Sequence, residues 1–222
     1  MNSFYRERLN FERALLLELK SGLKGSPWKL KSCALYKANG ALYQDIFLSV
    51  HKNAAVTMGV HRIKPMGLDP LLWEILGIPE NVDEPLSFRT WGAFTCAGLP
   101  IAEVALESAG NSAQAVAEAT RSLCGSADVR AEQQLQAAPF SLLVAAHPDH
   151  VERGAYSVTL VTSLIAEGSL ELAAREAHAY ASATKQSCAN LSSEGKSFHE
   201  LALRWLEAAR ASGAAVGASA GA

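Results

Sequence analysis

Hydrophobic side chains recur at helical spacing near the beginning of the chain. Between residues 4 and 23 the apolar positions fall on one face, and most charged side chains fall elsewhere: Phe4, Leu9, Phe11, Leu15, Leu16 and Leu19. This period of about 3.6 residues predicts an amphipathic helix. Ser3 is placed to cap its start, and the glycines and proline at Gly22, Gly25 and Pro27 are typical of its end.

The pattern then changes to the two-residue alternation of strands. The segments that show it, or are rich in strand-forming residues, are 28–37, 41–50, 55–63 and 87–96. Asn39-Gly40 joins the first two as a hairpin turn, because both residues tolerate positive φ. Pro100 is expected to end the last segment. These signals predict an antiparallel meander of about four strands, on which the N-terminal helix packs.

Helical periodicity dominates the rest of the chain. Asp69 and Pro70 are typical of an N-cap and first helical position, which predicts a short helix ending at Gly77. Composition shifts toward Ala, Glu and Leu near residue 110. Helices are then predicted at 112–123, 127–136, 140–147, 151–166, 169–183 and 197–211, with a strand as the alternative for the β-branched stretch GAYSVTLVTSLIA.

The fold class that follows is α+β, with an N-terminal helix and sheet and an all-helical C-terminal half. We expect a sheet domain at 1–110 and a helical region at 111–212. The helices either cover the open face of the sheet or form a separate lobe. Residues 213–222, GAAVGASAGA, are of low complexity and are expected to be a flexible tail.

Composition narrows the classes of partner. The 222 residues are 49% hydrophobic and 19% charged, with a net charge of −2, which is typical of a globular protein. No run of Lys or Arg offers a nucleic-acid surface. No segment approaches the roughly 20 apolar residues that a membrane span needs, and the N-terminus lacks the features of a signal peptide. We expect no nucleic-acid or membrane partner and a cytoplasmic location.

No motif for catalysis, cofactor binding or metal binding emerges. The cysteines Cys33, Cys96, Cys124 and Cys188 are far apart, which does not suit zinc and favours reduced thiols. The chain has no GxSxG elbow, phosphate-binding loop or dinucleotide fingerprint. His147-Pro148-Asp149-His150 holds the one close histidine pair, without a third ligand in register. We therefore assign no catalytic residue, metal or cofactor. An enzyme with a cryptic site there, or with a Cys–His pair, remains an alternative.

One stretch combines carboxylates with aromatic residues. It reads LLWEILGIPENVDEPLSFRTWGAF over residues 71–94, with Asp69 just upstream. Aromatic residues dominate interface hot spots, and a negative patch steers a basic partner. The candidate partner-binding residues are Asp69, Glu74, Glu80, Asp83, Glu84 and Trp91. The plainer interpretation is a solvated acidic loop, with Trp73 filling the core.

The order of elements and several short words resemble a known kind of protein. They are Trp28-Lys29, Asp45-Ile46, Ser49-Val50, Lys64-Pro65, Asp69-Pro70-Leu71-Leu72-Trp73, Leu86-Ser87-Phe88-Arg89 and Gly92-Ala93-Phe94. Residues 4–110 resemble small bacterial α+β domains found beside polymorphic toxins, many of which serve as immunity proteins. The resemblance implies a protein that binds and blocks one cognate toxin, and it carries over no functional residues. We expect a protein partner, such as a basic toxin domain; a structural subunit of a larger assembly is a further alternative.

Overall fold

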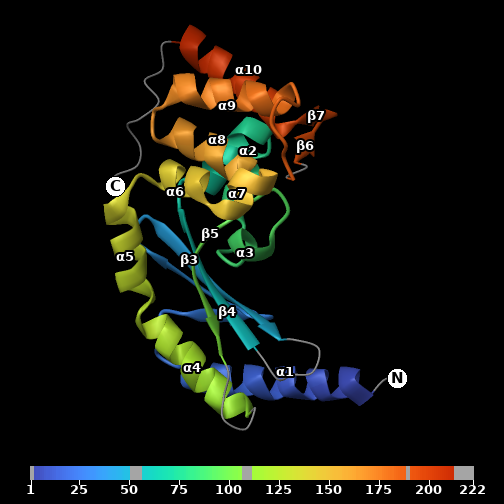
Figure 1. Ribbon diagram of the computed structural model, residues 1–222, viewed down its shortest axis with the longest axis vertical. Coiled ribbons are helices and arrows are strands. Elements are labelled where there is room, and N and C mark those ends of the chain that lie inside the picture. The colour runs from blue at the N-terminus through green and yellow to red at the C-terminus, as the bar shows by residue number, and fades with distance from the viewer. Residues whose placement is uncertain (1–2, 51–56, 107–111, 189–190, 213–222) are drawn as a thin grey trace. The chain divides into compact units, whose positions relative to one another are not determined.

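The computed structural model describes residues 3–50, 57–106, 112–188 and 191–212. The fold is α+β, as predicted (Figure 1). The chain forms two compact units that alternate along the sequence. Unit 1 comprises Met1–Ile63 and Gly98–Gln136, and unit 2 comprises Lys64–Ala97 and Ala137–Ala222. This division does not follow the change of composition near residue 110. The expected flexible tail at 213–222 lies outside the described residues.

Unit 1 combines three helices with an antiparallel sheet. The predicted N-terminal helix is present as α1 (Ser3–Gly22). The sheet has five strands in the order β1-β2-β3-β4-β5. Helices α4 and α5 follow the last strand, and α4 packs along α1. The bounds are β1 Lys29–Lys31, β2 Ala34–Asn39, β3 Leu42–Val50, β4 Thr57–Pro65, β5 Leu99–Ala105, α4 Ala113–Gly125 and α5 Ala127–Ala137.

The sheet differs from the predicted meander and has five strands rather than four. The segment 28–37 is two strands, because the chain turns back at Ser32, where φ is +52°. The hairpin at Asn39-Gly40 is confirmed, with Gly40 at φ +56° and Asn39 still paired with Leu42. The prediction of a strand at 87–96 is wrong. The strand that pairs with β4 at the edge of the sheet is β5, at Leu99–Ala105. Pro100 lies within β5 and does not end it, and the register of β4 shifts opposite Pro100. An edge strand tolerates a proline because its outward face needs no N–H donor.

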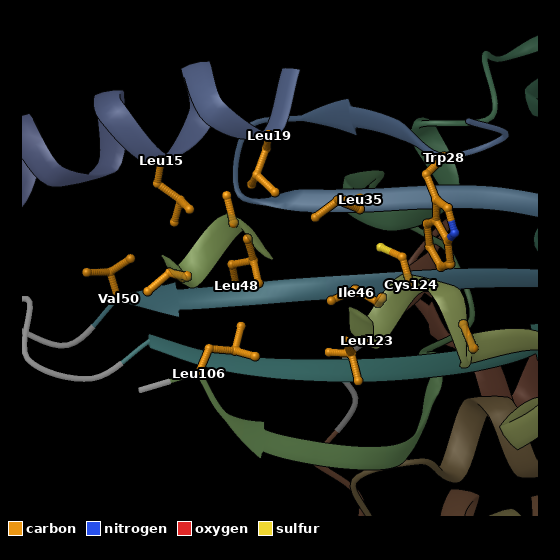
Figure 2. Packing of buried hydrophobic residues seen from close by; sticks show 13 residues of the cluster. Leu15, Leu19, Trp28, Leu35, Ile46, Leu48, Val50, Leu106, Leu123 and Cys124 are labelled. Carbon is orange, nitrogen blue, oxygen red and sulfur yellow. The ribbon is translucent and has the colours of Figure 1, made fainter. Parts of the chain in front are cut away.

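One face of the sheet packs against α1 and α4. Alternate residues of β3 enter this core, as the two-residue period of a strand requires. Figure 2 shows them meeting leucines of α1 from one side and residues of α4 from another. The buried side chains are Leu15, Leu19, Trp28, Leu35, Ile46, Leu48, Val50, Leu106, Val116, Ala117, Leu123, Cys124 and Ala127.

Unit 2 is mostly helical. Each predicted helix of this part is present, although the expected helix 151–166 is two helices. They are separated at Gly154, where φ is +65° and the carbonyl of Gln186 leaves no room for a side chain. The elements are α2 Leu68–Leu76, η1 Pro79–Asp83, α3 Phe88–Trp91, α6 Phe140–Ala146, α7 Pro148–Arg153, α8 Ser157–Ala166, α9 Leu170–Ala181, β6 Ser192–Ser193, β7 Lys196–Ser197 and α10 Phe198–Ala211.

Helix α8 is the centre of unit 2. It contacts α2, α6, α9 and α10, and every residue from Ser157 to Ile165 is buried. The hydroxyls of Thr162 and Ser163 donate to carbonyls one turn earlier, to Val158 at 2.8 Å and to Thr159 at 2.6 Å. A helix that is buried on all sides needs no polar face, so this β-branched sequence is helical and not a strand. No helix among the described residues is long and apolar enough to cross a membrane.

Helix α1 offers a matched test of the core of unit 1. Leu19 is fully buried against the sheet, whereas Leu17 is 68% exposed. We expect Leu19→Ala to lower the free energy of unfolding by about 2–5 kcal/mol through lost contacts and a residual cavity. Leu17→Ala should change it by less than about 0.5 kcal/mol. Urea unfolding followed by circular dichroism measures both, and equal effects would contradict this packing.

Candidate functional site

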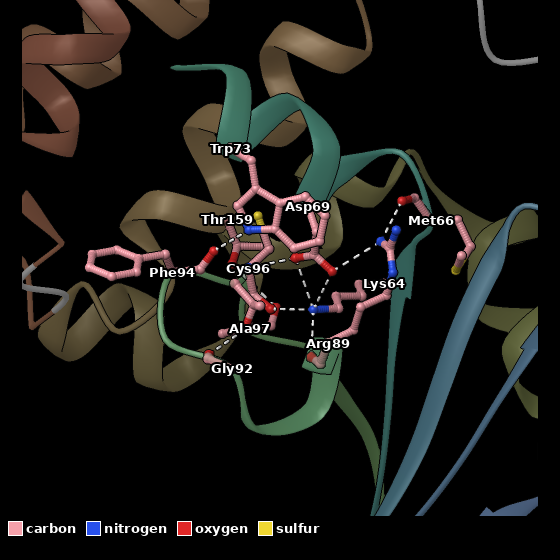
Figure 3. Close-up of polar contacts among 11 residues, drawn as sticks. Lys64, Met66, Asp69, Trp73, Arg89, Gly92, Phe94, Cys96, Ala97 and Thr159 are labelled. Carbon is pink, nitrogen blue, oxygen red and sulfur yellow. Dashed lines mark hydrogen bonds and ion pairs between the residues drawn. The ribbon is translucent and has the colours of Figure 1, made fainter. Parts of the chain in front are cut away.

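A buried carboxylate organises the segment in which the partner surface was predicted. Asp69 is 0% exposed. Its oxygens accept hydrogen bonds from Lys64 Nζ at 2.9–3.0 Å, from Arg89 Nη1 at 3.2 Å and from the backbone N–H of Cys96 at 2.8 Å (Figure 3). An isolated buried charge would be very costly, so this set of partners is what allows Asp69 to lie inside the protein.

The Lys64 ammonium fixes the backbone of the following loop. It is 1% exposed and also donates to the carbonyls of Arg89 at 2.9 Å and Cys96 at 2.8 Å. These two bonds and the one to Asp69 match the three N–H donors of an ammonium group. The loop is held at one more point by Trp73, whose indole N–H donates to the carbonyl of Phe94 at 2.7 Å. Residues 89–96 are therefore tied to the interior by their carbonyls.

This network explains why the predicted strand at 87–96 is absent. The segment forms the short helix α3 and then an irregular stretch in which Phe94 has φ +63°. Carbonyls that point inward to Lys64 and Trp73 are not available for a sheet ladder. The expected N-cap role of Asp69 is also wrong: α2 begins at Leu68, its N-cap is Gly67, and no side chain caps it.

Three exposed carboxylates lie on the turn that follows α2. We call Glu80, Asp83 and Glu84 the acidic ridge. All three are exposed, and Val82 between them is 57% exposed. Among the described residues, no Lys, Arg or His lies within ion-pair distance of these carboxylates. The ridge therefore presents exposed negative charge without an ion-pair partner among the described residues.

The acidic ridge is held in a defined conformation. Gly77 ends α2 at φ +73°, and the N–H of Ile78 donates to the carbonyl of Trp73 at 2.9 Å. Pro79 begins η1, and the Glu84 N–H closes it by donating to the carbonyl of Asn81 at 3.2 Å. Since Trp73 is itself buried, the turn is attached to the core of unit 2.

The other predicted partner residues have different surroundings. Asp69 is enclosed, so it cannot contribute to a surface. Glu74 is exposed and accepts a hydrogen bond from the indole N–H of Trp205 at 3.0 Å, which links α2 to α10. Trp91 is the last residue of α3, and its side chain is outside what the structure describes. The structure thus leaves Glu74 and the acidic ridge as accessible candidates.

The histidine pair at His147 and His150 is divided between two structural roles. His147 accepts the backbone N–H of Asp149 at 3.2 Å and caps α7. His150 is buried and its Nε2 lies 3.1 Å from the hydroxyl of Tyr180. Within the described part of the chain, no three His, Cys, Asp or Glu side chains are grouped as a metal site would require.

A second polar network lies on the sheet of unit 1 and was not predicted. Lys37 Nζ donates to both carboxylate oxygens of Asp128 at 2.7 Å and lies 4.7 Å from the ring centre of Trp28. Gln44 links Asp128 to His61 through bonds of 2.7 and 3.1 Å. Burial lowers the pKa of His61 to about 4. Because His61 is 0% exposed, a substrate has no access to it, and we assign the network a structural role.

Burial also determines the state of most of the thiols. It raises the pKa of Cys96 and Cys124 to about 12, and it raises that of Cys33 as well. A thiol with a raised pKa carries little of the thiolate that acts as a nucleophile. These surroundings give no support to a Cys–His pair built on these three thiols.

A cavity of about 300 Å³ lies in unit 2 beside the loop that Lys64 and Trp73 hold. Phe94, Thr95 and Ala97 line it from the loop, and Val158 and Thr159 line it from α8. The lining carries no ionisable side chain among the described residues, and Thr159 donates its hydroxyl to the carbonyl of Ala97 at 3.2 Å. The cavity therefore offers no group for acid–base chemistry.

Comparison with protein-family models, with curated proteins and with solved structures found no match for this chain.

Removal of the Asp69 charge tests the buried network. We expect Asp69→Asn to lower the free energy of unfolding by about 3–5 kcal/mol, because Lys64 would remain buried without its counter-charge. Urea unfolding at pH 7 measures this loss. Asp83→Asn, on the exposed ridge, should change stability by less than about 0.5 kcal/mol and is the matched control. Comparable losses in the two variants would contradict the role of Asp69.

Thiol reactivity tests the cysteine environments. Cys188 is exposed, Cys33 is partly buried, and Cys96 and Cys124 are buried. With a chromogenic disulfide reagent at pH 8, we expect one fast thiol in the folded protein and four in denaturant. Cys188→Ser should remove the fast phase. A fast phase that persists in this variant would show that one of the other thiols is activated.

Proposed function

We propose that the protein is a cytosolic protein-binding module, an immunity protein that neutralises a cognate bacterial toxin by occluding it. The observation that supports this proposal best is the acidic ridge: Glu80, Asp83 and Glu84 are exposed, close in sequence and without a cation of their own among the described residues. The resemblance of residues 4–110 to immunity-type domains supplies the biological class. The ridge supplies the surface.

The ridge has two properties that suit a binding surface. Its backbone is ordered before binding, since Gly77, Pro79 and the hydrogen bond at Glu84 fix the turn. A surface that is already ordered loses less conformational entropy on association. Val82, which lies between the carboxylates in sequence, also offers an exposed apolar side chain nearby. A partner can thus bury an apolar contact while its cations meet the surrounding charges.

The charge of the ridge indicates the chemistry of the partner. Three carboxylates within five residues repel one another and attract a basic surface. We infer that the partner presents Lys or Arg side chains around an apolar contact, as a basic toxin domain would. Glu74 extends the negative surface, although one of its oxygens is already bonded to Trp205. Asp69 is excluded by its burial.

Neutralising the ridge should weaken partner binding through slower association. We expect the variant Glu80→Gln, Asp83→Asn, Glu84→Gln to bind a basic partner with an association rate lower by about tenfold at low salt, and with a weaker dependence on ionic strength. The partner is first captured with the tagged wild-type protein from its own cytoplasm and identified by mass spectrometry. Surface-based kinetics at several salt concentrations then compare the variants.

The matched control neutralises three exposed glutamates elsewhere, Glu132, Glu152 and Glu207. It changes the net charge by the same amount and should leave the association rate within about twofold. Equal losses in both triple variants would show a net-charge effect and not a site. An unchanged rate in the ridge variant would remove the ridge from the interface, and capture of an acidic partner would contradict the inferred chemistry.

A further inference from the structure

Two buried histidines of unit 2 meet the same tyrosine. His150 on α7 lies 3.1 Å from the Tyr180 hydroxyl through its Nε2, and His199 on α10 lies against the Tyr180 ring, with 4.8 Å between ring centres. His150 is 8% exposed and His199 is 4% exposed. This cluster joins α7, α9 and α10, since Tyr180 belongs to α9. None of the functions discussed above uses it.

The imidazole rings of this cluster lack acceptors for an added proton. His150 Nδ1 and His199 Nε2 are buried and have no hydrogen-bond partner among the described residues. A protonated imidazole has two N–H donors and a positive charge, and both must be satisfied. Within the described part of the chain, neither ring forms an ion pair with a carboxylate. The cluster is therefore built for neutral imidazoles.

The charged groups around His150 do not compensate for its burial. Burial lowers the pKa of His150; Glu176 opposes this shift, whereas Lys185 and His147 add to it. Glu176 is itself paired with Lys185 at 2.7 Å. The Lys185 ammonium also lies 5.8 Å from the ring centre of Tyr180. The surroundings of His150 thus include both charges, with the negative one already paired.

The surroundings of His199 are less favourable still. Burial alone lowers the pKa of His199 to about 4. The elements packed on α10 are α2, α8, α9 and β7. Helix α8 carries no charged residue, Glu74 of α2 bonds to Trp205, and Glu171 of α9 pairs with Arg210. The other charged residues of these elements are Asp69 of α2, Arg175 and Glu176 of α9, Lys196 of β7, and Glu200, Arg204 and Glu207 of α10 itself. Asp69 pairs with Lys64, Glu176 pairs with Lys185, and Glu200 bonds to the N-cap Ser197.

The position of His199 along α10 adds a second penalty for protonation. His199 lies in the first turn of the helix, whose N-terminal end carries the positive pole of the helix dipole. A positive charge is disfavoured at this end. Buried proton uptake at His199 and His150 therefore opposes the packing of α10 on α9.

We propose that protonation of His150 and His199 releases α10 from α9, which makes this helix contact an acid-sensitive conformational device. The direction follows from linkage. We call the state in which α10 packs on α9 the closed state. In this state each histidine has a lower pKa than its ordinary value of 6.5. The closed state is thus fully favoured above pH 6.5 and loses that advantage as the pH falls toward 4. In the opened state the imidazoles are exposed to solvent and bind protons more readily than in the closed state.

Hydrogen exchange at two pH values tests the proposal. For His199 alone, a closed-state pKa of about 4 and an open-state value of 6.5 predict that the opening equilibrium rises by about 30-fold between pH 7.5 and pH 5. The protection factors of α10 amides at residues 201–206, corrected for intrinsic exchange, should fall by at least that ratio. The amides of α4 at residues 116–123, in the other unit, provide the internal comparison.

Two variants separate this cause from general acid lability. His199→Phe keeps an aromatic ring against Tyr180 and should remove about 30-fold of the pH effect. His178→Gln, at an exposed position on α9, should leave it unchanged. Protection of α10 that is independent of pH in the wild type would overturn the proposal, as would a pH effect in His199→Phe that is as large as in the wild type.

A measurement on the wild-type protein covers the case in which His199→Phe does not fold. The imidazole signals of His150 and His199 are followed by NMR from pH 7.5 to 4. The proposal requires that they remain those of neutral rings until α10 loses protection. Titration near pH 6.5 with α10 still protected would overturn it.

Discussion

The Lys64–Asp69 ion pair is the constraint on which the candidate surface of unit 2 depends. Two charges at 1% and 0% exposure are tolerable only when every donor and acceptor is matched, and the match is made by backbone groups of residues 89 and 96 as well as by side chains. The loop is irregular because its carbonyls serve the ammonium. Asp69 and Trp73 bind the same loop from α2, which also carries the acidic ridge at its C-terminal end. The same helix is thus anchored to the loop by Asp69 and Trp73 and leads directly into the ridge.

Local patterns in the sequence predicted the elements whose stability is local or amphipathic. Helix α1 and the helices from α4 onward follow their periodicity, apart from the break at Gly154, and Gly40 marked a hairpin. The failures occur where a distant group decides the structure. Ser87–Cys96 alternates like a strand, but its carbonyls bind Lys64 and Trp73. Residues 28–37 turn at Ser32 without glycine. The sequence of these segments does not indicate such partners, so periodicity alone could not predict their structure.

The candidate site was predictable to the same degree. Glu80, Asp83 and Glu84 lie between Pro79 and Pro85, and a charged loop bracketed by prolines is expected to be exposed, as it is. Asp69 carries the same charge and lies nearby in sequence, yet it is enclosed. The difference is Lys64 and Arg89, five residues before and 20 residues after Asp69. Nothing in the sequence around Lys64, at the end of β4, indicates that this lysine is buried, and its partner could be identified only from the structure.

Charged groups in the interior have partners, whereas the carboxylates of the ridge have none among the described residues, and this difference supports the proposed function. The buried lysine of each unit is paired with a carboxylate, Lys37 with Asp128 and Lys64 with Asp69. The buried imidazoles avoid charge instead, as the lowered pKa values of His61 and His199 show. The ridge does neither, since its carboxylates are neither paired within the described chain nor neutral by burial. Their mutual repulsion destabilises the free protein slightly and is screened by salt. Under the proposed function, a cationic partner would remove this repulsion on binding.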